Sequence, residues 1–319
     1  LAANTTTNHN TAVGQGALQL NTAAANTAVG SAALNQNSTG TNNVAVGYQA
    51  LDANTTASGC TAVGKDSLTA SNANNNSAFG RTSLYANTTG TNNTGLGVNA
   101  LYANTTGSNC TAVGLSALEQ NNASDNTALG YQAALTNTTG NNNVAIGRNA
   151  FYANTTGAEN VAVGAYALDA NTTADYNVAI GYNAMTQSTT AQRCVAVGRE
   201  AGESLTTGSY NTLLGYTAGH EITTGYRNVA IGEESMYFVT TGSLNVCVGN
   251  QTLHLNQTGN ENTALGFRAC YGGTTGTANV GVGCSALKAV STGNNNVAVG
   301  KNALSATTTG SSNVAVGEE

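Results

Sequence analysis

The stretch Asn-Val-Ala-Val-Gly at residues 43–47 decides the fold, because variants of it return along the whole chain. A glycine closes each of nineteen copies, and the first three, Gly14, Gly30 and Gly47, set a spacing that the rest of the chain keeps. Repeats of this length are too short for ankyrin, tetratricopeptide or propeller units, and they fit one coil of a β-solenoid. The copies at 143–147 and 313–317 differ from the first by at most one methyl group.

Each position, counted from the motif glycine, keeps its chemical character from copy to copy. Position −1 is always large and apolar, position −2 is alanine in fifteen copies, and position −4 is asparagine in sixteen. A β-branched run such as Val44–Val46, bounded by asparagine and glycine, predicts a strand. Parallel strands of neighbouring coils would stack about 4.8 Å apart. The sequence therefore predicts an all-β fold, a parallel β-solenoid of nineteen coils with 16–17 residues each.

The motif glycine is expected at a corner where φ is positive or where two backbones approach closely. Clear examples of this structural glycine are Gly47, Gly64, Gly147, Gly164, Gly181, Gly232 and Gly300. Position +4 is usually leucine, and positions +7 to +10 usually read Asn-Thr-Thr-Gly, which is turn chemistry. We expect residues 1–319 to form a single repeat domain, an uncapped segment of a longer array.

The composition excludes several classes of function. Only 8% of residues are charged and the net charge is −6, which leaves no basic surface for nucleic acid or an anionic membrane. The apolar runs are a handful of residues long, so no membrane span is expected. Low net charge and abundant valine, isoleucine and threonine favour an ordered chain over a disordered one.

The strands have two apolar faces. Side chains alternate along a strand, so positions −1 and −2 point to opposite faces, yet both are apolar. A strand with one solvated face is normally polar on that face. The small residues at position −2 indicate close packing on a flat surface, either the opposite wall of the same coil or a second chain. We favour a second chain, which predicts self-association as a homotrimer or filament.

The motifs at 43–47, 143–147 and 313–317 resemble the head repeats of YadA-type trimeric autotransporter adhesins. The phrase at 44–51, followed by Asn-Thr-Thr at 54–56, is similar to repeats of phage tail-fibre-like proteins. The resemblance implies a left-handed parallel β-roll, trimerised side by side, with an adhesive or spacer role outside the cell or on a virion. The coil here is longer than the adhesin head repeat.

No pattern predicts an enzyme, a metal site or a cofactor. His9, His220 and His254 lie on distant coils and are not expected to converge, which argues against a catalytic triad or a histidine-based metal site. Glu200 and Glu203 can meet acidic residues of adjacent coils. A convex wall, however, offers little of the enclosure that paired catalytic carboxylates need.

The six cysteines are not expected to form intrachain disulfides. Cys60, Cys110 and Cys194 share position −4 but lie three and five coils apart, roughly 14 and 24 Å at the spacing of stacked strands. Bridged Cα atoms lie within about 7 Å of each other. Bridges between chains remain open if position −4 faces a symmetry axis, and the alternative is that cysteine is a small, half-buried substitute for asparagine.

Two ladders of turn residues are candidate surface sites. Glycan acceptors of the Asn-x-Ser/Thr type are Asn37, Asn54, Asn87, Asn104, Asn137, Asn154 and Asn171. The hydroxyls of Thr89 and Thr156 are equally eligible, and the alternative is that Asn-Thr-Thr is turn chemistry alone. Threonine at position +9 in fifteen of eighteen coils also suggests an ice-binding ladder, although it lies in a turn.

These observations predict a structural or adhesive extracellular fibre segment, non-enzymatic and decorated with glycans. Its expected place is the surface of a cell or virion, with host or cell-surface glycans as further partners. The alternative is a surface binding module for glycans or ice.

Overall fold

The computed structural model describes residues 2–318, and these form nineteen three-residue strands and no helix. They fall into two compact units, one extending to Glu159 and the other starting at Asn160. The strands of the first unit are β1 (Thr11–Val13), β2 (Thr27–Val29), β3 (Val44–Val46), β4 (Thr61–Val63), β5 (Ser77–Phe79), β6 (Thr94–Leu96), β7 (Thr111–Val113), β8 (Thr127–Leu129) and β9 (Val144–Ile146). Those of the second are β10 (Val161–Val163), β11 (Val178–Ile180), β12 (Val195–Val197), β13 (Thr212–Leu214), β14 (Val229–Ile231), β15 (Val246–Val248), β16 (Thr263–Leu265), β17 (Val280–Val282), β18 (Val297–Val299) and β19 (Val314–Val316).

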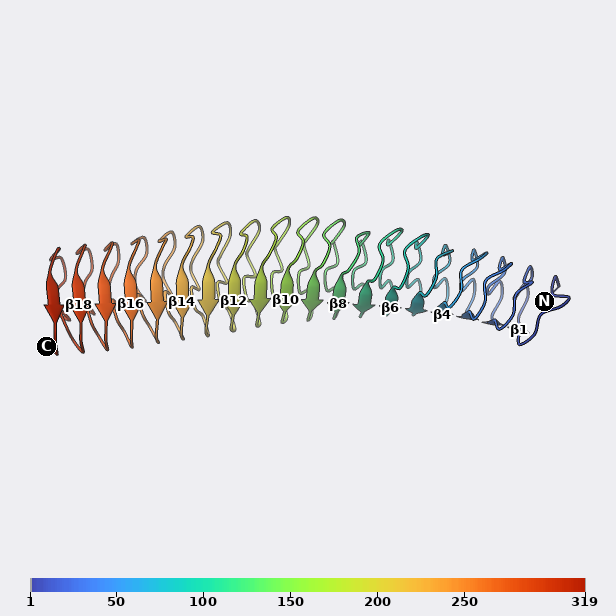
Figure 1. The fold of residues 1–319 in the computed structure, drawn as a ribbon, viewed down its shortest axis with the longest axis horizontal. Helices are drawn as coiled ribbons and strands as arrows, with labels where there is room; N and C mark the ends of the chain where they lie inside the picture. The colour runs from blue at the N-terminus through green and yellow to red at the C-terminus, as the bar shows by residue number, and fades with distance from the viewer. Residues whose placement is uncertain (1, 319) are drawn as a thin grey trace. The chain divides into compact units, whose positions relative to one another are not determined.

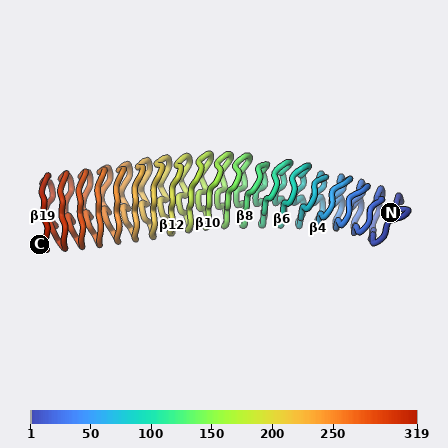
Figure 2. The backbone as a smooth tube through the Cα atoms, in the orientation of Figure 1, coloured from blue at the N-terminus to red at the C-terminus, as the bar shows by residue number. Residues whose placement is uncertain are grey.

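Within each unit every strand pairs in parallel with the strand of the next repeat (Figure 1). The register joins equal positions of successive repeats, so that Ala45 pairs with Ala62 in the first unit and Ala230 with Cys247 in the second. The backbone makes one turn per repeat in each unit (Figure 2). This confirms the predicted parallel β-solenoid with one coil per glycine motif.

Each coil turns its corners through residues in the left-handed region. Besides the motif glycine, positions −5, +2 and +4 have positive φ, as in Asn42 (59°), Gln49 (53°) and Leu51 (54°). A left-handed non-glycine residue costs about 1–2 kcal/mol. Backbone bonds to neighbouring coils offset this cost, because the Gln49 N–H donates to Ser31 O at 3.0 Å and the Leu51 N–H donates to Ser67 O at 3.0 Å.

The core of the coil is thin and consists mainly of alanine and leucine. Ala45 at position −2, Ala50 at +3 and Leu51 at +4 are all fully buried. At Gly95, which takes position −2 in its coil, an added Cβ would lie 3.3 Å from Ala100 O and 3.5 Å from Leu84 Cγ. The alanine face therefore packs on the opposite wall of the solenoid. The expectation of a second chain on that face is wrong, because side chains at position −2, such as Ala45 and Ala112, are fully buried inside the coil of a single chain.

One exception to the alanine pattern shows how tightly this core is filled. Leu213 replaces alanine at position −2, and glycine replaces leucine at position +4 in its own coil, at Gly219, and in the preceding coil, at Gly202. A Cβ added to Gly202 would lie 2.6 Å from Leu213 Cδ1, and one added to Gly219 would lie 2.7 Å from Leu213 Cδ2. One large side chain thus occupies the space that two leucines fill elsewhere, as close packing requires.

Buried asparagines at position −4 tie neighbouring coils together. The Asn228 N–H donates to Asn211 Oδ1 at 2.9 Å, and Asn228 Nδ2 donates to Gly242 O at 2.8 Å. Asn228 Oδ1 in turn accepts from the Asn245 N–H at 3.0 Å. Because a buried polar group must find a partner, this ladder fixes the register of each coil on the next.

Candidate functional site

The seven structural glycines occupy the predicted corners. Their φ angles lie between 127 and 139°. At Gly232 an added Cβ would lie 2.5 Å from Gly249 O, the carbonyl oxygen of the next motif glycine. Both reasons given for glycine, positive φ and close backbone approach, are therefore confirmed, and the role is structural.

The turn asparagines point inward. Asn37, Asn54, Asn87, Asn104, Asn137, Asn154 and Asn171 are all fully buried. Asn54 is typical, because its Nδ2 donates to Asn37 Oδ1 at 2.9 Å and to Ala57 O at 3.1 Å. A glycan on Nδ2 has no room and would remove these bonds. The structure thus contradicts these asparagines as N-linked glycan sites of the folded chain and favours the turn-chemistry alternative.

The threonines of the same turns face outward. Thr89 and Thr156 at position +9 are exposed, while Thr88 at position +8 donates its hydroxyl to Thr105 O of the next coil at 3.0 Å. Thr89 and Thr156 are therefore accessible to solvent, and O-linked modification of these two residues stays a prediction.

The outer strand face, which we define as positions −3 and −1 of β1–β19, is uncharged and partly exposed, with apolar residues throughout position −1. Leu96 and Leu129 of the first unit are 48% and 47% exposed, and Val248 of the second is 38% exposed. Every residue of this face is valine, threonine, serine, leucine, isoleucine or phenylalanine. All nine basic and fifteen acidic residues of the chain stand at other positions.

The six cysteines are free thiols in this structure. Cys60, Cys110 and Cys194 are buried at position −4, so the idea that this position faces a symmetry axis is wrong. Cys60 takes over part of the asparagine role, because its Sγ contacts Ala73 O at 3.2 Å. Burial raises the pKa of the Cys194 thiol to about 11, and only Cys284 is exposed.

Several glutamate side chains and one histidine side chain lie close together in the segments that follow β12 and β13. This carboxylate–histidine cluster consists of Glu200, Glu203, His220 and Glu221. His220 Nε2 lies 3.0 Å from Glu203 Oε2, and His220 Nδ1 lies 3.0 Å from Glu221 Oε1. Glu200, Glu203 and His220 each offer a ligand atom within 4.8 Å of the other two. The histidine is therefore held between carboxylates from its own coil and the preceding one.

An aromatic ladder continues from His220 along position +5 of the following coils, through Tyr237, His254 and Tyr271. Neighbouring rings are stacked with centroids 4.8, 5.5 and 5.2 Å apart. Phe238 meets both Tyr237 and His254 edge-on. Because the rings cover one another's faces, the ladder presents ring edges to solvent and stiffens the wall that carries the cluster.

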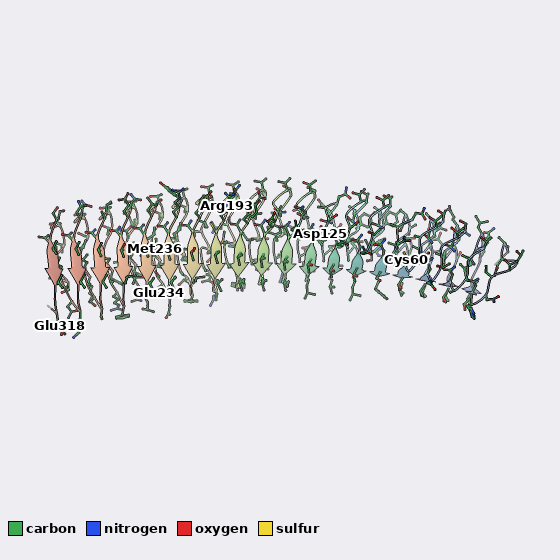
Figure 3. The ribbon with its side chains drawn as sticks, in the orientation of Figure 1. Cys60, Asp125, Arg193, Glu234, Met236 and Glu318 are labelled. Atoms are coloured by element: carbon green, nitrogen blue, oxygen red, sulfur yellow. The ribbon has the colours of Figure 1, made fainter. Side chains whose placement is uncertain are left out.

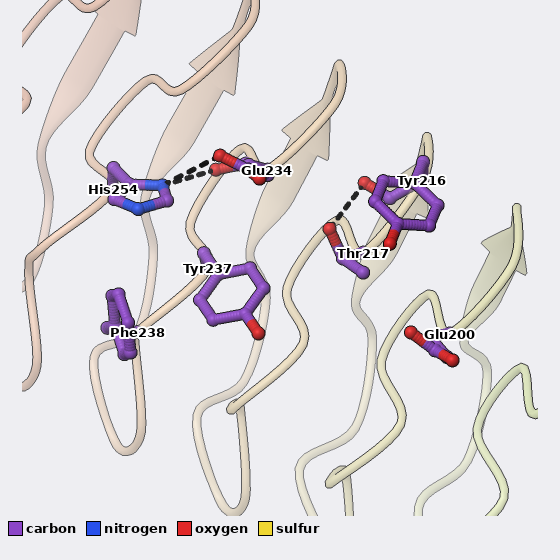
Figure 4. Close-up of a pocket in the computed structure, with 7 residues that line it drawn as sticks. All are labelled: Glu200, Tyr216, Thr217, Glu234, Tyr237, Phe238 and His254. Atoms are coloured by element: carbon purple, nitrogen blue, oxygen red, sulfur yellow. Dashed lines mark hydrogen bonds and ion pairs between the residues drawn. The ribbon is translucent and has the colours of Figure 1, made fainter.

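A shallow cavity of about 290 Å³ lies beside the ladder. In Figure 4 its lining comes from four successive coils, with Glu200 on one side and His254 on the other. Burial and the negative charges of Glu221, Glu234 and Glu200 raise the pKa of the Tyr237 hydroxyl. The cavity is thus an acidic, open depression suited to a small cation or a polar group.

Few arginine side chains contact the carboxylate–histidine cluster. Arg193 lies at the opposite edge from Glu234 (Figure 3), with its guanidinium 5.2 Å from the ring of Tyr176 and 5.6 Å from that of Tyr210. Among the described residues, Arg199 is the arginine that forms an ion pair with the cluster, 2.9 Å from Glu200 Oε1, and its side chain is 58% exposed. The cluster therefore holds three carboxylates against one arginine.

Sequence reasoning missed this cluster. His220 and His254 share position +5 two coils apart and are separated by the ring of Tyr237, so these two histidines do not meet at one site, and what was missed is the meeting of His220 with glutamates. His9 lies in the other unit. The sequence did contain a sign of this cluster. Glu203 and His220 are one repeat apart, and so are the aromatic residues that follow at position +5, which places these residues one above the other in successive coils.

The described residues contain no helix with the length and apolarity needed to cross a membrane. No protein-family model matches this chain, and no curated protein sequence is significantly similar to it.

Proposed function

We propose that this chain is a non-enzymatic structural segment of a fibre at the surface of a cell or virion, and that it self-associates through the outer strand face. The observation that carries the proposal is this face, which exposes apolar side chains in both units. Exposed contiguous apolar surface usually marks a site of association.

A second copy of the chain fits this face better than a partner of different chemistry. No charged residue stands on the face, so two copies can meet without burying a charge, which would be costly. The face repeats with the period of the strands, about 4.8 Å, so the ridges of one copy match the grooves of another at every coil.

The area of the face sets the strength of association. A three-residue strand is about 10 Å long and strands lie about 4.8 Å apart, so ten strands offer about 500 Å². A stable interface buries about 800 Å² on each partner. One unit therefore supports weak contact, and we expect affinity to grow with the number of coils engaged.

The role as fibre, spacer or adhesin rests further on the resemblance to trimeric adhesin heads and tail-fibre repeats. A solenoid of this kind becomes longer when coils are added, because each new coil packs on the preceding coil and needs no separate hydrophobic core. Threonine hydroxyls such as those of Thr89 and Thr156 would carry any O-linked glycans. Host or cell-surface glycans are the partners that the resemblance suggests.

The test is sedimentation velocity over a wide range of protein concentration, with electron microscopy of the same samples. We expect concentration-dependent assemblies, and we expect Val197→Lys with Val248→Lys to abolish them by placing charge on the outer strand face. A matched control, Thr207→Lys with Thr241→Lys, adds the same charge at exposed turn positions. Monomers at all concentrations, or equal loss in both double variants, would overturn the proposal.

A further inference from the structure

The strongest unassigned feature is the carboxylate–histidine cluster, because it brings three side chains with metal-binding chemistry to one point. Glu200 and Glu203 follow β12, and His220 follows β13. Their ligand atoms all lie within 4.8 Å of one another, and His220 Nε2 lies 3.0 Å from Glu203 Oε2. Two ligands bound to Zn²⁺ at about 2.1 Å with tetrahedral angles are about 3.4 Å apart. A shift on the order of 1 Å is thus enough to complete the set.

The backbone holds the three side chains in this arrangement. Around Glu203, the Gly202 N–H donates to Ala218 O at 2.9 Å, and the Ser204 N–H donates to His220 O at 3.0 Å. The two loops are thereby tied together on both sides of the candidate ligands. Ligands carried on loops fixed in this way need little ordering when an ion binds.

The other nitrogen of the histidine has the partner that a metal ligand normally has. His220 Nδ1 lies 3.0 Å from Glu221 Oε1, so with Nδ1 protonated, Nε2 turns its lone pair toward Glu200 and Glu203. A carboxylate on the remote nitrogen fixes the tautomer and strengthens the ring as a ligand. Stacking on Tyr237, with the two ring planes 1° apart, fixes the ring orientation as well.

The charge of the cluster favours a cation. Three carboxylates, those of Glu200, Glu203 and Glu221, face a single arginine. The side chains of Glu200, Glu203 and His220 are only 17, 22 and 16% exposed, so solvent screens them incompletely. Arg199 is 58% exposed and can leave Glu200 without desolvation. A divalent ion would therefore neutralise charge that the protein leaves in excess.

We propose that Glu200, Glu203 and His220 bind one divalent transition-metal ion, with Zn²⁺ as the best fit. One imidazole and two carboxylates suit a borderline ion better than Ca²⁺ or Mg²⁺, which prefer all-oxygen sites. Water fills the remaining position of the tetrahedron. The ion would pin two coils at the edge of the second unit and is independent of contact through the outer strand face.

The experiment is calorimetric titration of Zn²⁺ alone into the full chain without an affinity tag, after treatment with chelator. We expect one ion per chain. His220→Gln and Glu203→Gln each weaken binding at least tenfold, and Glu221→Gln weakens it about 10- to 100-fold while keeping the stoichiometry. His254→Gln is the matched control, because His254 shares position +5 and its ring stacking but has its nearest carboxylate at 3.9 Å.

Co²⁺ provides a second readout, since its visible absorption reports coordination geometry. We expect a tetrahedral spectrum in the parent chain and in His254→Gln, and none in His220→Gln. Circular dichroism confirms that each variant is folded, and Glu200→Gln replaces any variant that is not. No binding at one equivalent, or equal loss of binding in His254→Gln and His220→Gln, would overturn the proposal.

Discussion

Replacing one motif glycine by alanine should damage the solenoid more than any surface substitution. In Gly232→Ala the new Cβ would lie 2.5 Å from Gly249 O and 2.7 Å from Gly249 C, against 3.4–4 Å for ordinary contact. Both atoms are backbone, so the two coils must separate by roughly 1 Å. The bonds from the Gly249 N–H to Ile231 O at 2.8 Å and from the Gln251 N–H to Glu233 O at 3.0 Å join the same two coils and would then exceed hydrogen-bond range.

The magnitude follows from two contributions. Two lost backbone hydrogen bonds cost about 1 kcal/mol each, and a side chain at φ 127° adds strain on the order of 1–3 kcal/mol. We therefore expect Gly232→Ala to lower the free energy of unfolding by about 3–5 kcal/mol. Gly317→Ala separates the two effects, because Gly317 has a similar φ of 138° and nothing lies within 4 Å of its added Cβ.

The assay is urea denaturation followed by circular dichroism, combined with hydrogen exchange read by mass spectrometry. Since each coil contacts only its neighbours, lost protection should centre on β14 and β15 and leave distant coils of the second unit intact. The control variant should lose only the strain contribution. A loss below about 1 kcal/mol in Gly232→Ala, or the same loss in both variants, would refute the backbone-contact argument.

Three further outcomes are expected. Asn245→Ala should destabilise the chain by about 2–4 kcal/mol in urea melts, because Asn262 N–H and Asn262 Nδ2 both lose their acceptor, Asn245 Oδ1. Cys194→Asn should instead raise stability by about 1 kcal/mol in the same assay, since an amide oxygen replaces the 3.5 Å contact of Sγ with the Asn211 N–H. A thiol reagent should titrate Cys284 alone in the native chain and all six thiols in urea, because the other five are buried; more than one fast native thiol would contradict this burial.

The strands could be predicted because their positions obey simple rules. A short β-branched stretch such as Val44–Val46, bounded by asparagine and glycine, favours a strand over any other regular structure. Repetition with a nearly constant period then fixes parallel pairing of equal positions, as observed between Ala45 and Ala62. The local strand propensity and the length of the repeat both indicate a parallel β-solenoid, and for this reason the fold could be predicted from the sequence.

The direction of each face could not be predicted in the same way. Large apolar residues normally mark the inside, yet here Leu96 is 48% exposed and Ala112 is fully buried. The reason is the thickness of the coil, which depends on Leu101 and its equivalents at position +4. These leucines lie inside because they adopt a left-handed φ, which is 54° at Leu101. Leucine rarely adopts this conformation, so the residue type does not predict it.

The cluster escaped prediction for a related reason. Glu200 and Glu203 are three residues apart, and they approach one another only because the backbone turns through left-handed corners such as Glu200 itself, with φ of 57°. His220 joins them because it follows Glu203 by one full repeat and so lies directly in the next coil. Such a group is not apparent from distances along the sequence. It becomes apparent when each residue is numbered from the motif glycine of its own repeat, because equal positions in successive repeats are neighbours in space.

Position +5 is where this architecture can change chemistry without changing fold. The backbone ladder and the buried positions hold each coil, while position +5 carries residues as different as Asp52, Tyr85, Glu119, His220 and Lys288. Substitution there removes neither core volume nor a ladder bond, so its cost to stability is small. Where a glutamate such as Glu200 already stands at position +2, two substitutions at position +5 of adjacent coils therefore suffice to create such a site, and one suffices to erase it. A binding site on this wall can thus be gained independently of the interface on the outer strand face.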